Sequence, residues 1–174
     1  MGLDMYLEAR KYVGRIEWRA VPNPLPEGAS YNDYETADYK VIKELFPAQL
    51  LKHSDAGSSV SANVAYWRKA NAIHGWFVEN VQGGEDNCKE YGVERHQLVE
   101  LLETVTKVLE GDKDTAKELL PVREGFFFGN YDEDDGYDKW YYEQLGYTQD
   151  MITNLLEVVP ENTHEYGFYY QSSW

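Results

Sequence analysis

The strongest structural constraint in the sequence is the helical spacing of its aliphatic residues between Glu94 and Gly111. Six of them recur at intervals of three or four positions: Leu98, Leu101, Leu102, Val105, Val108 and Leu109. This spacing places all six on one side of an α-helix, which must then pack against another layer. A glycine commonly follows the last turn of a helix, so Gly111 ends the predicted amphipathic helix.

Residues 2–7 show a different periodicity. Leu3, Met5 and Leu7 alternate with polar residues, which predicts a half-buried β-strand. Helical spacing returns between Trp140 and Val159, and a short helix is expected after Asp112. The closing segment GFYYQSSW is predicted to be a last strand that pairs with the first. Segment 22–36 is rich in proline and is expected to be a loop, whereas 39–46 suits either a strand or a helical turn.

Both periodicities in one chain predict an α+β fold. We expect a small antiparallel sheet, made by the N- and C-terminal strands and the Phe126–Gly129 segment, packed with three to four helices. The length of 174 residues suits a single domain, 1–174, with its own hydrophobic core.

The chemically most mixed segment is SANVAYWRKANAIHGWFVENVQ, residues 61–82. It is predicted to be one helix, with caps offered by residues 58–61 and an end at Gly83-Gly84. A helical projection gives a core-facing stripe of Tyr66, Ala70, Ile73, Phe77 and Val81. A second stripe lies along its edge and contains Trp67, Asn71, His74 and Val78, with Arg68 beside Asn71.

This second stripe has two interpretations. Asn71 and His74 could simply hydrogen-bond to neighbouring backbone groups, because a buried polar group needs a partner. Alternatively, Trp67, Arg68, Asn71 and His74 line the mouth of a ligand pocket, where Arg68 and His74 can meet an anion. The candidate walls of such a pocket are Phe127, Tyr141, Ser173 and Trp174.

Charge and hydropathy exclude several classes of protein. The net charge of −15 argues against direct nucleic-acid binding, which needs clustered Lys and Arg. No run of apolar residues is long enough to span a membrane, and the first residues lack the features of a signal peptide. Cys88 is the one cysteine, so no intramolecular disulfide can form. We expect a cytoplasmic protein that acts in a host cell cytosol.

Motifs for common catalytic and metal sites are absent from the sequence. His53, His74, His96 and His164 never have the spacing of a zinc pair. A calcium loop starting at Asn130 fails, because its sixth position is Asp135 instead of glycine and its twelfth is Tyr141. We therefore predict no metal and no cofactor, and we interpret residues 130–138 as a solvated acidic loop.

Four segments together resemble a family of small proteins from tailed phages and prophages that has no established activity: MGLDMYL, YWRKANAIHGWFVENVQ, GFFFG and YYQSSW. The matching residues are Trp67, Arg68, Lys69, Ile73, His74, Trp76, Phe77, Asp86, Cys88, Phe126 to Gly129 and Ser172 to Trp174. The acidic loop is longer than in that family. The resemblance implies a phage or prophage origin and no particular reaction.

Three functions are compatible with these features. The first is a binding protein for a small planar or anionic ligand, which would sequester a nucleotide-like defence signal of the host. The second is an acidic inhibitor that binds a host enzyme, with its surface imitating nucleic acid. The third is an enzyme that uses His74 as a base and Arg68 as an electrophile. We expect ligand binding, and non-enzymatic action, ahead of the other two.

Overall fold

The computed structural model describes residues 2–46, 48–51, 58–123, 134–161 and 164–174. The described chain divides into two compact units, which are presented separately. Unit 1 contains residues 1–9 and 62–174, and unit 2 contains residues 10–61. The single-domain expectation therefore stays a prediction. The elements, in chain order, are β1 (Asp4–Val13), η1 (Tyr31–Tyr34), α1 (Ala37–Leu45), α2 (Ala48–Leu51), β2 (Ser58–Arg68), α3 (Asn71–Asn80), β3 (Tyr91–Val93), α4 (Arg95–Glu110), α5 (Lys113–Leu119), η2 (Asp134–Gly136), α6 (Lys139–Val158) and β4 (Tyr166–Ser173).

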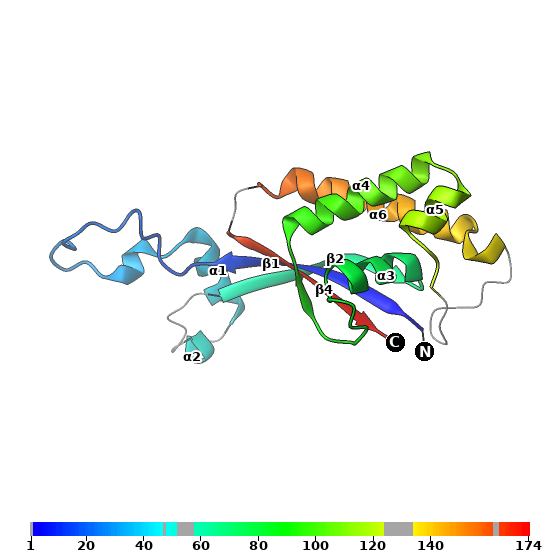
Figure 1. Ribbon diagram of the computed structural model, residues 1–174. Helices are drawn as coiled ribbons and strands as arrows, with labels where there is room; N and C mark the ends of the chain where they lie inside the picture. The colour runs from blue at the N-terminus through cyan, green and yellow to red at the C-terminus, as the bar shows by residue number, and fades with distance from the viewer. Residues whose placement is uncertain (1, 47, 52–57, 124–133, 162–163) are drawn as a thin grey trace. The chain divides into compact units, whose positions relative to one another are not determined.

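The strands form one four-stranded antiparallel sheet in the order β2-β1-β4-β3. The first and last strands are therefore neighbours, as the sequence predicted, and Figure 1 shows blue β1 beside red β4. The short strand β3 was not foreseen. It pairs antiparallel with β4, with Tyr91 opposite Tyr170 and Val93 opposite Phe168.

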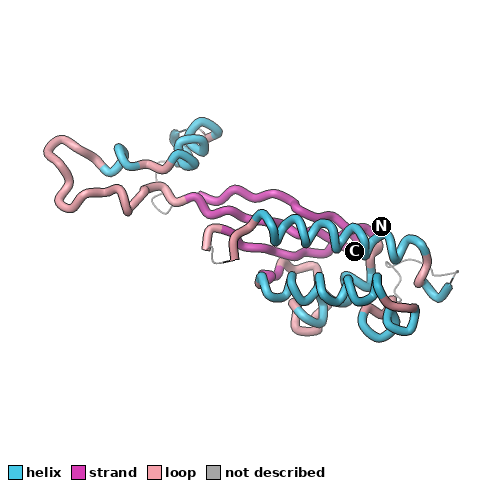
Figure 2. The backbone as a smooth tube through the Cα atoms, turned by 90° about the horizontal axis from the view of Figure 1, so that it is seen from above, coloured by secondary structure: helices cyan, strands magenta, loops and turns pink. Residues whose placement is uncertain are grey.

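The core of unit 1 lies between the sheet and a layer of helices. Figure 1 shows α4, α5 and α6 on one side of the sheet, and Figure 2 shows the long helices running along the strands. Each strand turns alternate side chains toward that layer, since successive side chains of a strand point to opposite faces. The fully buried strand residues are Met5, Leu7, Trp67, Tyr170 and Ser172, and Leu3, directly before β1, is fully buried as well.

Unit 2 has a small core of its own, made by Val13, Tyr39 and Ile42. Tyr39 and Ile42 lie on α1, which resolves the ambiguous segment 39–46 as a helix. The Thr36 hydroxyl caps α1 by accepting from the backbone N–H of Tyr39, 3.1 Å away. Most of segment 22–36 is a loop, and it contains the single 3₁₀ turn η1.

The prediction of one helix over residues 61–82 is wrong for its first half. Residues 58–68 form strand β2, and the helix α3 begins only at Asn71. Lys69 separates them in a left-handed conformation, with φ of 57°, which a continuous helix does not allow. Trp67 and Asn71 therefore do not share a helical stripe. Tyr66, expected in the core, is 47% exposed because it alternates with Trp67 along a strand.

The other helix predictions agree with the structure. The expected amphipathic helix is α4, which buries Leu98, Leu101, Val105 and Val108 and has Gly111 as its C-cap residue. Segment 140–159 forms α6, although Trp140 lies outside the buried stripe and is half exposed. The fold is α+β, as expected. The predicted strand Phe126–Gly129 lies outside the described residues.

Candidate functional site

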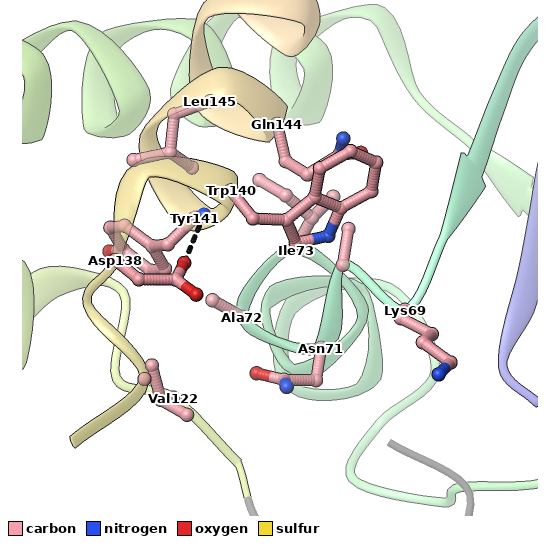
Figure 3. A pocket seen from close by; sticks show the side chains of 12 residues that line it. Lys69, Asn71, Ala72, Ile73, Val122, Asp138, Trp140, Tyr141, Gln144 and Leu145 are labelled. Atoms are coloured by element: carbon pink, nitrogen blue, oxygen red, sulfur yellow. Dashed lines mark hydrogen bonds between the residues drawn. The ribbon is translucent and has the colours of Figure 1, made fainter. Parts of the chain in front are cut away.

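A pocket opens in unit 1 between the first turn of α3 and the first turns of α6, and we call it the α3–α6 pocket. It has about 310 Å³ of space between its walls, including open solvent. Figure 3 shows the indole of Trp140 lying across the start of α3, with Ile73, Asn71 and Lys69 below it in this view. The remaining lining residues are Ala70, Ala72, Val122, Gly136, Asp138, Tyr141, Gln144 and Leu145.

Local structure explains why Trp140 is at the surface. Asp138 is the N-cap of α6, and its carboxylate accepts from the backbone N–H of Tyr141 at 2.9 Å. The buried stripe of α6 starts at Tyr141 and continues through Leu145 and Thr148. Trp140 precedes this stripe by one residue, about 100° around the helix, so its ring is turned from the core to the pocket. Half of its surface is exposed (50%).

Tyr141 closes the inner side of the pocket. Its hydroxyl donates to the carbonyl oxygen of Leu120 at 2.9 Å, so the side chain ties α6 to the segment after α5. Burial raises the pKa of Tyr141 well above its ordinary value, with smaller contributions from Tyr137 and Tyr142. Tyr141 is therefore a neutral wall residue at physiological pH.

Asn71 is the first residue of α3 and is only 4% exposed. Its Oδ1 accepts from the backbone N–H of Arg123 at 3.0 Å. This bond fixes the orientation of the amide, because only the oxygen can accept. The Nδ2 amino group has no partner among the described residues, and the side chain lines the pocket.

A second polar cluster surrounds His74 on the next turn of α3. His74 is 1% exposed, its Nδ1 lies 2.8 Å from the hydroxyl of Tyr170, and its Nε2 lies 3.0 Å from Oδ1 of Asp86. The same carboxylate oxygen accepts from the indole Nε1 of Trp174 at 3.2 Å. Both ring nitrogens of His74 are thus engaged by protein groups from the loop after α3 and from β4.

The electrostatics of this cluster favour a neutral imidazole. Burial is the largest influence and lowers the pKa of His74, while Asp86 acts in the opposite direction and Arg123 lowers it further. Burial also raises the pKa of the Tyr170 hydroxyl. The consistent tautomer has Nε2–H donating to Asp86 and Tyr170 donating to Nδ1. The cluster resembles a buried structural network more than an exposed base.

The structure separates the sequence-predicted site residues into groups. Asn71 and Tyr141 line the α3–α6 pocket, whereas His74 and Trp174 meet at Asp86. Trp67 is fully buried, and its indole donates to the hydroxyl of Thr148 at 2.9 Å. Arg68 and Ser173 are exposed at the ends of β2 and β4 and line no part of the pocket. Phe127 lies outside the described residues.

Sequence reasoning missed Trp140, Lys69 and Asp138 as lining residues of a pocket. A signal for Trp140 was present, because Asp138 is a good helix cap and Tyr141 begins the stripe that includes Leu145. An aromatic residue outside that stripe must be exposed or partnered. For Lys69 no such signal exists, since its place depends on the turn between β2 and α3.

In the described parts of the chain, no three His, Cys, Asp or Glu side chains gather closely enough to hold a metal ion. Those same residues include no helix with the length and hydropathy needed to cross a membrane. Comparison of the chain with protein-family models, curated proteins and solved structures finds no match.

Proposed function

We propose that this protein binds a small, planar, anionic ligand with the chemistry of a nucleotide, and that it binds it in the α3–α6 pocket. The observation that carries the proposal is the half-exposed indole of Trp140, which lines the pocket together with the polar side chains of Asn71 on α3 and Gln144 on α6. An exposed aromatic face that lines a hollow offers a stacking surface to a planar ligand.

Stacking on Trp140 would contribute directly to the affinity. A heteroaromatic ring that stacks on an aromatic side chain contributes about 1–3 kcal/mol to the free energy of binding, whichever substituents the ring carries. Loss of the indole should therefore weaken binding by roughly 5- to 150-fold. The apolar floor made by Ala72 and Leu145 suits the edge of such a ring.

The two walls of the pocket differ in polarity. The α6 wall offers the carboxylate of Asp138 and the side chain of Gln144, whose amide has no partner among the described residues. These groups can accept hydrogen bonds from an exocyclic amine. The α3 wall offers the donor groups of Asn71 and Lys69. A ligand with an amine at one end and an anion at the other matches this division.

The biological use that we propose follows from the resemblance to phage and prophage proteins. In that setting, a non-enzymatic protein that binds a nucleotide-like molecule would sequester a defence signal of the host. The His74 network does not favour the enzymatic alternative, because both ring nitrogens already bond to protein groups.

Titration calorimetry with a panel of nucleoside monophosphates tests ligand binding. We expect heat of binding with the wild-type chain, and a loss of roughly 5- to 150-fold in affinity for Trp140→Ala. Trp18→Ala is the matched control, since Trp18 is also exposed but belongs to unit 2. No binding of any member of the panel, together with no small molecule released from the purified protein on denaturation, would refute the proposal.

A second candidate, the acidic inhibitor, is favoured by the distribution of charge. Unit 2 contains seven Lys and Arg against seven Asp and Glu, so the whole net charge of −15 belongs to unit 1. Such a field would attract a basic partner. Affinity capture from a bacterial lysate tests it: a specific partner released by moderate salt supports this function, and capture that is insensitive to salt contradicts it.

A further inference from the structure

Strand β2 lies at one edge of the described sheet, so only one of its two sides pairs with another strand. It is 11 residues long, and its stretch from Ser58 to Trp67 contains no charged residue and no proline. Natural edge strands are usually short, charged, bulged or interrupted by proline, because an open edge is a template for pairing with another chain. The opposite edge follows this rule, since β3 has three residues. The edge formed by β2 lacks that protection.

The hydrogen bonds of β2 show which backbone groups lie at the open edge. The backbone N–H of Lys69 donates to the carbonyl oxygen of Leu3 at 2.8 Å, toward the β1 side. These directions alternate along an antiparallel strand. The N–H of Tyr66 accordingly points away from β1 and donates to the hydroxyl of Tyr147 on α6, 3.2 Å away. The next outward-facing residues are Val64, Ala62 and Val60, and no described group outside the sheet bonds to their backbone.

The side chains along this edge complement a second copy of the same strand. If two copies of β2 run antiparallel about a twofold axis at Ala62, Val60 of one copy faces Val64 of the other. On the opposite face of the strand, Ser61 faces Asn63 in the same way. Cross-strand side-chain pairs are the unit of sheet stabilisation, and here each pair matches in polarity. Val60 is half exposed (49%) in the single chain, so pairing would cover apolar surface.

We propose that β2 pairs antiparallel with β2 of a second copy of this chain, about a twofold axis at Ala62, so that two four-stranded sheets become continuous. Each outward-facing residue then exchanges two backbone hydrogen bonds with the residue opposite it. The contact uses the same surface on both copies, and it therefore closes at two chains. This inference goes beyond the proposed function and does not depend on the α3–α6 pocket.

Charge sets the expected response of this dimer to salt. The chain has a net charge of −15, so two copies repel each other at long range. The uncharged stretch of β2 lets them meet without placing like charges opposite each other. Salt screens the long-range repulsion and leaves the backbone hydrogen bonds in place. Added sodium chloride should therefore tighten the dimer.

Two substitutions at Ala62 test the contact. Ala62→Pro removes an N–H that faces away from β1, at the kind of edge position where a strand tolerates proline. Ala62→Lys places two like charges directly opposite each other at the twofold axis. Gly92→Lys is the matched control, because it adds the same charge on the other edge strand, where a Cβ meets nothing within 4 Å. Circular dichroism and urea unfolding establish that each variant is folded.

Analytical ultracentrifugation over a range of concentrations measures the association. The wild type and Gly92→Lys should pass from one chain to two as concentration rises, and more readily in added salt. Ala62→Pro should weaken the dimer by about ten- to a hundredfold, because two symmetry-related hydrogen bonds are lost. Ala62→Lys should weaken it as well.

Cross-linking tests the register, in a Cys88→Ser background that removes the exposed native cysteine. Residues opposite each other in a hydrogen-bonded antiparallel pair have Cα atoms about 5.5 Å apart, which a disulfide can span. Ala62→Cys should therefore give a linked dimer on mild oxidation. Ser59→Cys should not, because in this register it faces Ala65 of the other copy.

Three results would overturn the inference. A wild type that stays monomeric at every concentration excludes the pairing and leaves a strand from another protein as the remaining occupant of this edge. A dimer that neither Ala62 variant weakens uses a different surface. Assembly that continues beyond two chains contradicts a closed twofold contact. Should Ala62→Pro be unfolded, Ala62→Lys and the cross-linking decide. None of these results affects the proposed ligand binding.

Discussion

The hydroxyl of Tyr170 lies 2.8 Å from Nδ1 of His74, and both side chains are buried. Tyr170 is on β4 and His74 is on α3, so this bond joins the sheet to the helix whose first turn lines the α3–α6 pocket. The opposite ring nitrogen bonds to Asp86. His74 is therefore the central member of a chain of hydrogen bonds, and its protonation state affects the stability of the fold.

The first prediction concerns pH. In the unfolded chain His74 binds a proton at its ordinary pKa, about 6.5, whereas burial lowers the pKa in the folded chain despite Asp86. Below about pH 6.5 the unfolded state then holds more protons, so the free energy of unfolding should fall as pH falls. Urea unfolding measured at several pH values should show this loss.

Two variants test the assignment of that loss to His74. His74→Gln should have a smaller decrease in stability between about pH 6.5 and about pH 5 than the wild type, although it is less stable at neutral pH. His96→Gln is the control, because it removes a histidine at an exposed position on α4 that lies outside this chain of hydrogen bonds. Identical profiles for all three proteins would show that His74 does not titrate as described.

Removing the hydroxyl of Tyr170 should destabilise the fold. Tyr170→Phe keeps the ring, which stacks on Phe77 with centroids 3.9 Å apart, but it leaves Nδ1 of His74 unpaired. We expect a loss of about 1–3 kcal/mol in the free energy of unfolding. Tyr66→Phe is the control, since it removes an exposed hydroxyl that donates to Asp4, and its effect should be much smaller. Equal losses would contradict the role of burial.

Removing the hydrogen bond between Trp67 and Thr148 should lower the free energy of unfolding by a similar amount. Thr148 is fully buried on α6, and its hydroxyl accepts from the Trp67 indole on β2. Thr148→Val conserves shape and should cost about 1–3 kcal/mol, because the indole N–H then stays unpaired. Thr148→Ser retains the hydroxyl and should preserve most of the stability. A double-mutant cycle with Trp67→Phe, read by urea unfolding, should show coupling between the two positions.

Gly75 makes room for Arg123. A Cβ at position 75 would lie 2.6 Å from Cδ of Arg123 and closer still to its Nε, and the Arg123 guanidinium bonds to Glu79 one turn further along α3. Gly75→Ala should therefore displace Arg123. In an Arg123→Ala background the same substitution should stabilise α3 by about 1 kcal/mol, through helix propensity alone. Thermal unfolding of the four proteins tests this, and a gain of the same size in both backgrounds would contradict it.

The sequence predicted those elements that can be recognised without knowing which other elements they pack against. The spacing of Leu98, Leu101 and Val105 indicates α4 whatever it packs against, and the alternation of Leu3, Met5 and Leu7 indicates β1 in the same way. The end of α3 was equally predictable, because Gly83 and Gly84 follow this helix and both have a positive φ. Each of these signals is local.

The candidate site was predicted only in part, because its residues were assigned to one helix. Residues 71–78 are all buried, so α3 itself has no amphipathic period that could reveal where it begins. Ala65 and Trp67 are buried whereas Tyr66 and Arg68 are exposed, which is the alternation of a strand. This short alternating segment is followed almost at once by the apolar helix α3. Projecting both segments onto a single helix therefore placed residues of β2 on helical stripes that do not exist.

The sequence by itself determined the α+β class, the amphipathic helices, the pairing of terminal strands and the charge of the chain. Only the tertiary structure decided that residues 58–68 join the sheet beside β1, that Trp67 is buried and that Trp140 is exposed above α3. It also decided that His74 meets Asp86 and Tyr170. Periodicity reflects only how each residue relates to its neighbours within one element. These contacts join residues from different elements, so their energies depend on which residues of the other element they meet.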